Sequence, residues 1–287
     1  MYIDDGSDKI YVGETNPDTT GLGDAVLVTA IVKAVNKKYP EKKIILRLPG
    51  PKTPFLNNPR IYSIEDGVCG LDQGVQTFGK TIEQIGGDGF YYLDENGNKR
   101  PADRHHTTNK CKWFGIESAN PTPELFVSEE EKNVAEATLK MLCGDRPAIF
   151  LCRNSTMPQR DWVQEGWIKV VDMLTRKYDV FQVEETIRYN KQTKMPERVM
   201  TTVPNARQEF RGYDVRKLIA LMSVSKRYLG VNTGFMPIAT AFGSDNVVFA
   251  DNRCAGDGTW LFPQNTHIWN FHSIDEIVEI VKNKWML

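Results

Sequence analysis

Residues 21–24, Gly-Leu-Gly-Asp, stand directly ahead of an apolar run that is typical of a helix. Glycine at positions 21 and 23 lets the backbone approach a ligand closely, and the carboxylate of Asp24 could take a proton from a hydroxyl. The alternative is a cap, because an aspartate at a helix start satisfies free N–H groups and favours the helix dipole. Taken alone, Gly21, Gly23 and Asp24 favour the cap. The spacing is not the dinucleotide fingerprint, since the third glycine is missing.

A second loop follows the strand-like stretch 227–231 and opens a short helix. Asn232, Thr233 and Gly234 place a carboxamide, a hydroxyl and bare backbone at the start of that helix. Exposed N–H groups at such a place bind phosphate readily. A plain N-cap at Asn232 or Thr233 would explain the same residues equally well.

A third loop, residues 152–162, supplies Ser155 and Arg160. Arginine offers a planar and always charged fork of donors to a phosphate, although a surface ion pair is its commoner role. Ser155, Arg160 and Thr233 all follow strand candidates of the same half of the chain. Carboxyl ends of parallel strands meet at one edge of a sheet, so these loops together predict a diphosphate site.

The elements that would carry these loops alternate between strand and helix. In the first half, strands are predicted at 9–14 and 43–48, with a helix after Asp24 between them. In the second half, strands are predicted at 148–152, 179–183, 227–231 and 246–250, with helices at 164–177, 214–225 and from 273 onward. Ser273 and Glu276 form a capping-box pattern at the last helix. Residues 49–110 are rich in Gly, Asn, Asp and Pro and predict long loops and short strands.

This alternation predicts an α/β protein with two Rossmann-like domains. We expect residues 1–140 to form an N-terminal acceptor-side domain and residues 141–287 to form a nucleotide-binding domain, with the seam near 121–147. The amphipathic segment 273–287 is expected to pack back on the first domain.

Composition limits the classes of partner and compartment. The net charge of −1 gives no overall field for nucleic acid or anionic lipid. The five cysteines are scattered and odd in number, which argues against a disulfide framework or a zinc knuckle and favours a reducing compartment. No run approaches the roughly 20 apolar residues that span a bilayer. We expect a cytoplasmic protein, with contact to the inner face of the membrane left open.

Four segments in order resemble the heptosyltransferase-like glycosyltransferases, the ADP-heptose:LPS heptosyltransferase type. These are residues 20–40, with Gly-Leu-Gly-Asp and a helix ending in Tyr-Pro, and 154–174, with a polar loop, a basic residue, Trp and a helix. The block 211–243 ends in Asn-Thr-Gly and a small-residue helix, and 246–252 follows it as a strand. The resemblance implies the GT-B fold, in which two Rossmann-like domains face each other across a cleft and the C-terminal helix crosses back to the first domain.

The resemblance also implies a reaction, the metal-independent transfer of a sugar from a nucleotide-diphosphate donor to an acceptor hydroxyl. Asp24 matches the family's proposed general base, and Gly21 and Gly23 belong to its acceptor-side loop. No metal and no cofactor are implied. The co-substrate is a nucleotide-diphosphate sugar, an ADP-sugar by resemblance, and the acceptor is a glycan, a lipid-linked molecule or a macromolecule.

Donor-binding positions carry over in the same way. Glu184, or its neighbour Glu185, would bind ribose hydroxyls, and Arg211 would lie where the family's backbone borders the base. The full donor-binding set is Ser155, Arg160, Glu184, Arg211, Asn232, Thr233, Gly234 and Phe235.

Two departures from the family keep other functions open. The family's Asp before Thr-Gly is Asn232 here, and its His is Pro237. These changes motivate a non-catalytic nucleotide-sugar or glycan binder as the alternative from another class. A sugar-nucleotide epimerase or hydrolase of the same fold is a further alternative, although it would need more acid and base residues than the loops supply.

Overall fold

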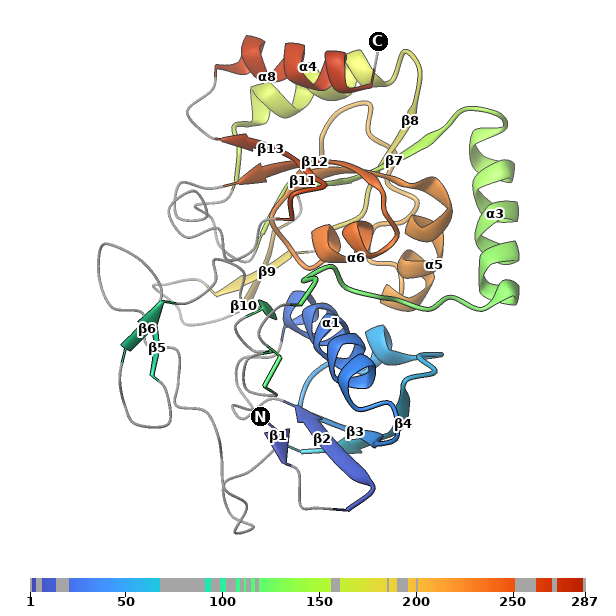
Figure 1. Cartoon of the computed structure of the whole chain (residues 1–287). Coiled ribbons are helices and arrows are strands. Elements are labelled where there is room, and N and C mark those ends of the chain that lie inside the picture. Colours follow the sequence, from blue (N-terminus) through green and yellow to red (C-terminus); the bar gives the residue numbers. More distant parts are fainter. Residues whose placement is uncertain are drawn as a thin grey trace. The chain divides into compact units, whose positions relative to one another are not determined.

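The computed structural model in Figure 1 describes fifteen stretches of the chain. They are residues 2–3, 7–13, 21–67, 91–93, 99–101, 107–108, 111, 115–116, 119–155, 161–184, 186–189, 196–199, 201–250, 262–269 and 273–285. The contacts group these residues into two units. Unit 1 contains the described residues up to Phe126 and also Phe262, and unit 2 contains the others from Val127 onward.

Unit 1 is built on a four-stranded sheet in the order β1-β2-β3-β4. Strands β2 (Lys9–Gly13), β3 (Lys43–Leu48) and β4 (Ile61–Asp66) run parallel, and β1 (Tyr2–Ile3) is antiparallel to β2. The helix α1 (Leu22–Lys38) packs on this sheet through an apolar face that includes Val28, Val32 and Val35. A short 3-10 turn, η1 (Thr53–Phe55), and a hairpin of β5 (Tyr91–Leu93) and β6 (Lys99–Pro101) complete the described part. The predicted strands at 9–14 and 43–48 and the helix between them are confirmed.

Unit 2 has a parallel five-stranded sheet in the order β13-β12-β11-β7-β8. Its strands are β7 (Ala148–Cys152), β8 (Asp179–Gln182), β11 (Arg227–Val231), β12 (Asp245–Ala250) and β13 (Thr266–Trp269). The chain adds β8 on one side of β7 and later adds β11 on the other side. This reversal is the topological switch point at which open α/β sheets bind ligands, outside the carboxyl ends of the strands.

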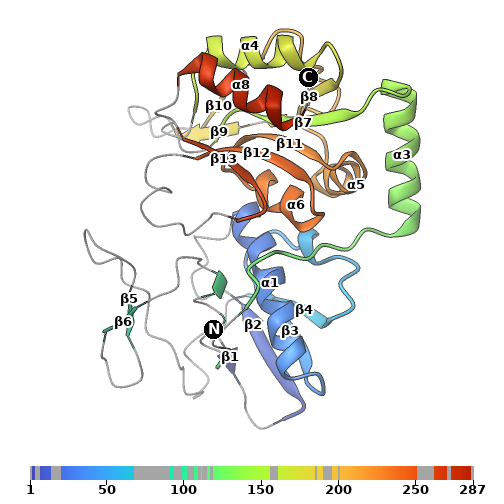
Figure 2. The same cartoon turned by 45° about the horizontal axis from the view of Figure 1, so that its top comes forward.

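Helices cover both faces of the unit 2 sheet, as Figures 1 and 2 show. On one face lie α4 (Gln164–Leu174) and α8 (Ile274–Lys284), and on the other lie α5 (Val215–Ser225) and α6 (Phe235–Ala241). A further helix, α3 (Glu129–Cys143), packs against α5. A two-stranded hairpin of β9 (Thr186–Tyr189) and β10 (Pro196–Val199) follows β8 in the chain. The predicted strands and helices of this half are confirmed to within a few residues at each end.

The C-terminal helix α8 has its described core contacts in unit 2. Its buried side chains Ile277 and Val281, followed by Trp285, belong to the core of unit 2, where α8 lies against α4. The indole N–H of Trp285 donates to Asp245 at 2.9 Å and ties the end of the helix to the start of β12. These contacts assign the buried face of α8 to unit 2, and the packing of segment 273–287 on the first domain stays a prediction.

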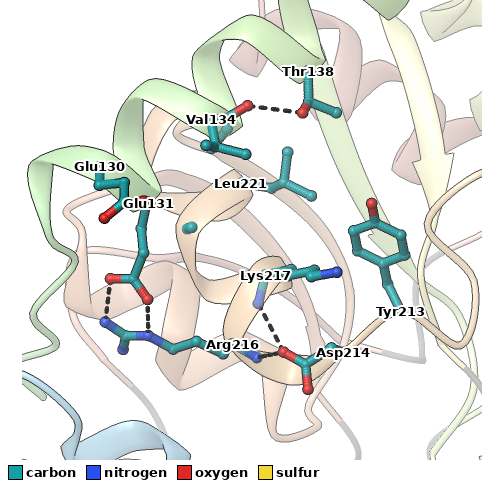
Figure 3. A pocket seen from close by; sticks show the side chains of 11 residues that line it. Glu130, Glu131, Val134, Thr138, Tyr213, Asp214, Arg216, Lys217 and Leu221 are labelled. Carbon is teal, nitrogen blue, oxygen red and sulfur yellow. Dashed lines mark hydrogen bonds and ion pairs between the residues drawn. The ribbon is translucent and has the colours of Figure 1, made fainter.

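The boundary between the units follows Phe126, within the expected seam 121–147, and α3 lies on its unit 2 side. Ser128 caps this helix in a capping box with Glu131. Both carboxylate oxygens of Glu131 accept from Arg216 of α5, at 2.5 and 2.6 Å, as Figure 3 shows. Since this ion pair joins α3 to α5, the helix belongs with the second half of the chain.

A pocket of about 400 Å³ lies between α3 and α5 (Figure 3). Val134 and Thr138 line it from α3, and Tyr213, Lys217 and Leu221 line it from the α5 side. No predicted donor-site residue lines this pocket.

The Glu131–Arg216 pair predicts a pH-dependent contribution to stability. The Arg216 guanidinium and the cap lower the pKa of Glu131 to about 2, from an ordinary 4.5. Because the folded pKa is depressed, the stabilisation is complete above pH 4.5 and is lost as the pH falls toward 2. Glu131→Gln should therefore lower the free energy of unfolding by about 1–2 kcal/mol at pH 7, the scale of a charge-assisted hydrogen bond in partly exposed surroundings.

Urea unfolding at pH 7 and at pH 3 measures this effect. Glu130→Gln is the matched control, because Glu130 is exposed and borders the same pocket. If Glu131→Gln and Glu130→Gln are equally stable at pH 7, the Glu131–Arg216 ion pair adds nothing to the free energy of unfolding.

Candidate functional site

The carboxyl ends of β7, β8 and β11 form the candidate site of unit 2. Cys152 ends β7, Gln182 ends β8 and Val231 ends β11. Because the three strands are parallel neighbours around the switch point, the residues that follow them share one edge of the sheet. Ser155, Glu184, Asn232, Thr233 and Gly234 all lie in these following segments.

The loop 232–234 enters α6 directly. Gly234 occupies the N-cap position, and no side chain caps the helix there. Asn232 is buried, and its backbone N–H donates to the carbonyl of Phe249 at 3.2 Å. Neither Asn232 nor Thr233 is the N-cap residue of α6, but the Thr233 hydroxyl accepts from the N–H of Phe235 at 3.4 Å.

A buried polar cluster lies beneath this loop. The Tyr228 hydroxyl donates to the Val231 carbonyl at 2.8 Å, and the Cys152 thiol donates to the Asn154 carbonyl at 3.6 Å. Both groups also lie 3.4 Å from the hydroxyl oxygen of Thr233. Burial raises the pKa of the Cys152 thiol and of the Tyr228 hydroxyl, so both keep their protons at neutral pH.

The protons in this cluster can be assigned by counting donors. Tyr228 and Cys152 each have one proton, and each proton already has a carbonyl acceptor. Toward Thr233 they can only accept, so the Thr233 hydroxyl proton points into the protein. A phosphate at this loop would then be bound by backbone N–H groups and not by the Thr233 hydroxyl.

Gly230 makes room for this cluster. A β-carbon at position 230 would lie 2.2 Å from the Cys152 carbonyl oxygen and 2.8 Å from the Tyr228 hydroxyl. The Tyr228 side chain reaches past Gly230 to the Val231 carbonyl because position 230 has no side chain. The spacing Tyr228-x-Gly230 is a signal in the sequence for this cluster.

Glu184, two residues beyond β8, is the buried acid of the site. It is 2% exposed, and its Oε1 accepts from the Gln182 amide at 2.8 Å. Among the described residues its Oε2 has no hydrogen-bond partner. Burial raises the pKa of Glu184 to about 7, against the opposing effects of backbone N–H groups, the Gln182 amide and the charge of Arg211.

Arg211 binds backbone carbonyls near Glu184. Its Nε donates to the Glu184 carbonyl at 3.2 Å, and its Nη2 donates to the Thr201 carbonyl at 3.1 Å. The guanidinium thus lies near Glu184 and fixes the segment around residue 201 to the chain after β8.

The loop after β7 is described only in part. Ser155 is buried, and its N–H donates to Asp161 Oδ1 at 3.3 Å. Arg160 lies outside the described residues. A different arginine, Arg153, is buried here, donates to Asn154 Oδ1 at 3.2 Å and also donates to Gln164. Sequence reasoning missed Arg153 because a charged residue just after a buried strand suggests an exposed loop.

Asp24 belongs to unit 1 and makes a capping contact. The helix α1 begins at Leu22 with Gly21 as its N-cap, so Gly23 and Asp24 lie in the first turn. Asp24 Oδ2 accepts from the N–H of Gly21 at 3.2 Å. The cap interpretation is thus confirmed, whereas the role of Asp24 as a base stays a prediction.

The structure therefore groups one set of predicted residues and leaves three in the other unit. The set in unit 2 consists of Ser155, Glu184, Arg211, Asn232, Thr233, Gly234 and Phe235. Gly21, Gly23 and Asp24 lie in unit 1. Within the described residues no group of His, Cys, Asp or Glu side chains could hold a metal ion. In the same residues, no helix has both the length and the apolar character needed to cross a bilayer.

Solved glycosyltransferases share this fold. A glycosyl transferase family 9 protein from Veillonella parvula aligns with a TM-score of 0.63 and 13% identity, over 95% of this chain and 88% of that one. The E. coli ADP-heptose LPS heptosyltransferase II aligns with a TM-score of 0.63 and 11% identity, over 96% and 98%. An E. coli heptosyltransferase solved with ADP aligns with a TM-score of 0.58 and 9% identity, over 96% and 99%.

At sequence identities of 9–13%, these alignments show that this chain and the solved glycosyltransferases share a fold. This likeness confirms the expected α/β GT-B fold and its resemblance to the heptosyltransferases. No protein-family model and no curated protein matches the sequence.

The buried carboxylate predicts an unusual stability profile. Since the folded pKa of Glu184, about 7, lies above the ordinary 4.5, the folded state holds a proton that the unfolded state releases between these values. The contribution of Glu184 to stability therefore falls as the pH rises from 4.5 to 7, by up to about 3 kcal/mol. Glu184→Gln removes this charge and keeps an acceptor oxygen for Gln182.

We expect Glu184→Gln to be more stable than the wild type at pH 8 and about equally stable at pH 4.5. Urea unfolding across this range measures the difference, and Glu130→Gln gives the baseline for an exposed glutamate. A constant difference between Glu184→Gln and wild type would mean that Glu184 titrates normally.

Proposed function

We propose that this protein is a glycosyltransferase that moves a sugar from a nucleotide-diphosphate donor to an acceptor hydroxyl. The observation that carries the proposal is Glu184, a buried carboxylate with one oxygen unpartnered among the described residues, at the switch-point edge of unit 2. A buried acceptor without a donor costs free energy, which a ligand hydroxyl could recover. The shared fold with solved glycosyltransferases makes a nucleotide sugar the fitting ligand.

In this proposal the donor lies along the edge of the unit 2 sheet. Glu184 accepts hydrogen bonds from the ribose hydroxyls. Backbone N–H groups of Thr233 and Gly234, together with Ser155 and Arg160, bind the diphosphate. Asn232, Phe235 and Arg211 complete the walls around the nucleotide. ADP is the favoured nucleotide, because one structural neighbour was solved with ADP and another with an ADP-heptose.

The acceptor side is assigned to unit 1. Asp24 takes the proton of the acceptor hydroxyl while the bond between the sugar carbon and the diphosphate oxygen breaks. The electron pair of that bond leaves with the diphosphate, whose growing charge is stabilised by the N–H groups around residue 233. Gly21 and Gly23 keep the loop near Asp24 free of bulky side chains. The chemistry requires neither a metal nor a cofactor, and we infer a glycan, lipid-linked or macromolecular acceptor at the cytoplasmic side of a membrane or in the cytoplasm.

A non-catalytic nucleotide-sugar binder is the second candidate. It is favoured by Asn232 and Pro237, which replace an aspartate and a histidine of the heptosyltransferase pattern. Both positions are buried, and Pro237 has no side chain that could bind a phosphate. A binder and a transferase differ in turnover and not in donor affinity, so the two are separable by experiment.

Donor binding is the first test of the proposal. Calorimetry with ADP, UDP, GDP and CDP should show preferential binding of ADP to the wild type. Arg160→Ala should weaken ADP binding by roughly 1.5–3 kcal/mol, the range for a charged hydrogen bond. Lys217→Ala, in the pocket between α3 and α5, is the matched control and should bind ADP as the wild type does. Absence of binding by every nucleotide would overturn the proposed donor site.

Transfer is the second test. Asp24 is the third residue of α1, and asparagine keeps an oxygen that can accept from the Gly21 N–H, so Asp24→Asn should keep the donor affinity and lower stability by only about 0.3–1 kcal/mol, the scale of the helix-dipole interaction. Asparagine cannot accept the proton, so single-turnover transfer should fall by roughly 10²–10⁴-fold. If Asp24→Asn transfers sugar at the wild-type rate, Asp24 is only a cap. If the wild type binds ADP-sugars but neither transfers nor hydrolyses them, the protein is a binder.

A further inference from the structure

We propose that Gln182 is a positioning residue of the donor site, whose buried amide orients Glu184 so that one carboxylate oxygen stays available to the nucleotide. The inference rests on the proposed function of this site and concerns how that site is kept ready to bind. Gln182 itself is fully buried and needs no contact with the ligand.

The Gln182 amide has all four of its hydrogen-bonding positions occupied. Its Nε2 donates to Glu184 Oε1 and to the Thr201 carbonyl, each at 2.8 Å. Its Oε1 accepts from the Val203 N–H at 2.9 Å and from the Gln208 amide at 3.2 Å. A side-chain amide offers two donors and two acceptor sites, so none is left over.

These partners also fix which end of the amide faces Glu184. The Thr201 carbonyl can only accept and the Val203 N–H can only donate. Turning the amide over would place oxygen against oxygen at Thr201 and N–H against N–H at Val203. The nitrogen must therefore face Thr201 and Glu184, so Gln182 presents a donor to the carboxylate in every state that keeps these backbone contacts.

As a consequence, the two carboxylate oxygens of Glu184 differ in their hydrogen bonding. Oε1 is engaged by Gln182, and Oε2 has no partner among the described residues. A donated hydrogen bond favours the charged carboxylate, against a burial that raises the pKa. Without Gln182, Glu184 would be protonated over a larger part of the neutral range and would accept less readily from ribose hydroxyls.

Other charged and titratable groups around Glu184 act in known directions. Arg211, from the segment after the hairpin, favours the carboxylate, as does the backbone N–H of Arg153 at the end of β7. Cys152 of β7 and Tyr228 of β11 interact with Glu184 but keep their protons. Of the groups named here, Gln182 is the one whose side chain donates to the carboxylate.

Gln182 could alternatively serve only to hold the segment 201–208 against β8. This segment also bonds to β8 by its backbone, through Arg207 N–H to the Val180 carbonyl at 2.7 Å and Gln182 N–H to the Arg207 carbonyl at 2.8 Å. Gln208 offers a comparison, because its amide donates to Gln182 Oε1 and to the Ala206 carbonyl and accepts from Arg211 at 3.4 Å, while Arg211 is also bonded to the Glu184 and Thr201 carbonyls. Gln208→Met removes the hydrogen bond from Gln208 to Gln182 and keeps the bond from Gln182 to Glu184. Gln182→Met removes the bond to Glu184.

The experiment measures Glu184 and ADP binding separately. Carbon-13 NMR of labelled glutamate carboxyls, assigned with Glu184→Gln, follows the titration in the ligand-free proteins. We expect the midpoint of Glu184 to rise by on the order of one pH unit in Gln182→Met and to stay unchanged in Gln208→Met. Calorimetry should show ADP affinity at pH 7 lowered about tenfold in Gln182→Met and less than twofold in Gln208→Met. At pH 9 most of the loss in Gln182→Met should be recovered.

Two outcomes would overturn the inference. One is an unshifted Glu184 midpoint in Gln182→Met, and the other is an equal loss of ADP affinity in both variants at every pH. If Gln182→Met does not fold, Gln182→Asn withdraws the amide by one methylene and is read by the same criteria. If the wild type binds no nucleotide, the proposed function fails, while the carboxyl titration still decides whether Gln182 controls Glu184.

Discussion

A carboxylate inside a protein must find compensation for its lost hydration, and in unit 2 this constraint falls on Glu184. Burial works against the charge, and the surroundings offset it with a side-chain amide, backbone N–H groups and a nearby guanidinium. The compensation is incomplete, since Oε2 has no partner within the described residues. The buried charge of Glu184 lowers the stability of the protein above neutral pH. Binding sites commonly lower the stability of the folds that carry them.

The topology makes the compensation possible. With β8 and β11 on opposite sides of β7, the residues after three parallel strands come together at one edge. Gln182 of β8 then bonds both to Glu184 and to Thr201, which returns after the β9–β10 hairpin. Tyr228 of β11 and Cys152 of β7 support Thr233 from below. The Gln182–Thr201 and Cys152–Thr233 contacts join residues 19 and 81 positions apart in the sequence, so the site depends on the order of the strands in the sheet.

The sequence predicted the regular elements because their signals are local. Apolar residues of β3 and β7 are buried as expected, and the Ser273–Glu276 capping box starts α8 where the pattern predicted it. The partners of α3 and α8 could not be predicted in the same way. The ion pair of Glu131 spans 85 residues, and nothing in the amphipathic pattern of α8 says which sheet it covers.

The predicted site residues come from motifs and from the family resemblance, whereas the residues that were missed are recognisable only by their burial. Thr233 and Gly234 follow from the loop pattern, and Glu184 followed from the family resemblance. Gln182 was missed because a glutamine near the end of a strand suggests an exposed side chain, whereas it is fully buried. Its four partners lie in segments 182–184 and 201–208, and only the folded chain shows that these segments meet.

Asn232 fits this electrostatic arrangement. It follows β11, two strands away from the end of β8, a separation of about 10 Å at the usual spacing of strands. An aspartate at this position would add a second negative charge to an edge that already holds Glu184, and like charges raise each other's pKa. An asparagine removes that repulsion and also the repulsion of a diphosphate. In the proposed donor site, asparagine in place of the aspartate of the heptosyltransferase pattern therefore eases the ionisation of Glu184 and the binding of an anionic donor, so it does not by itself argue against that site.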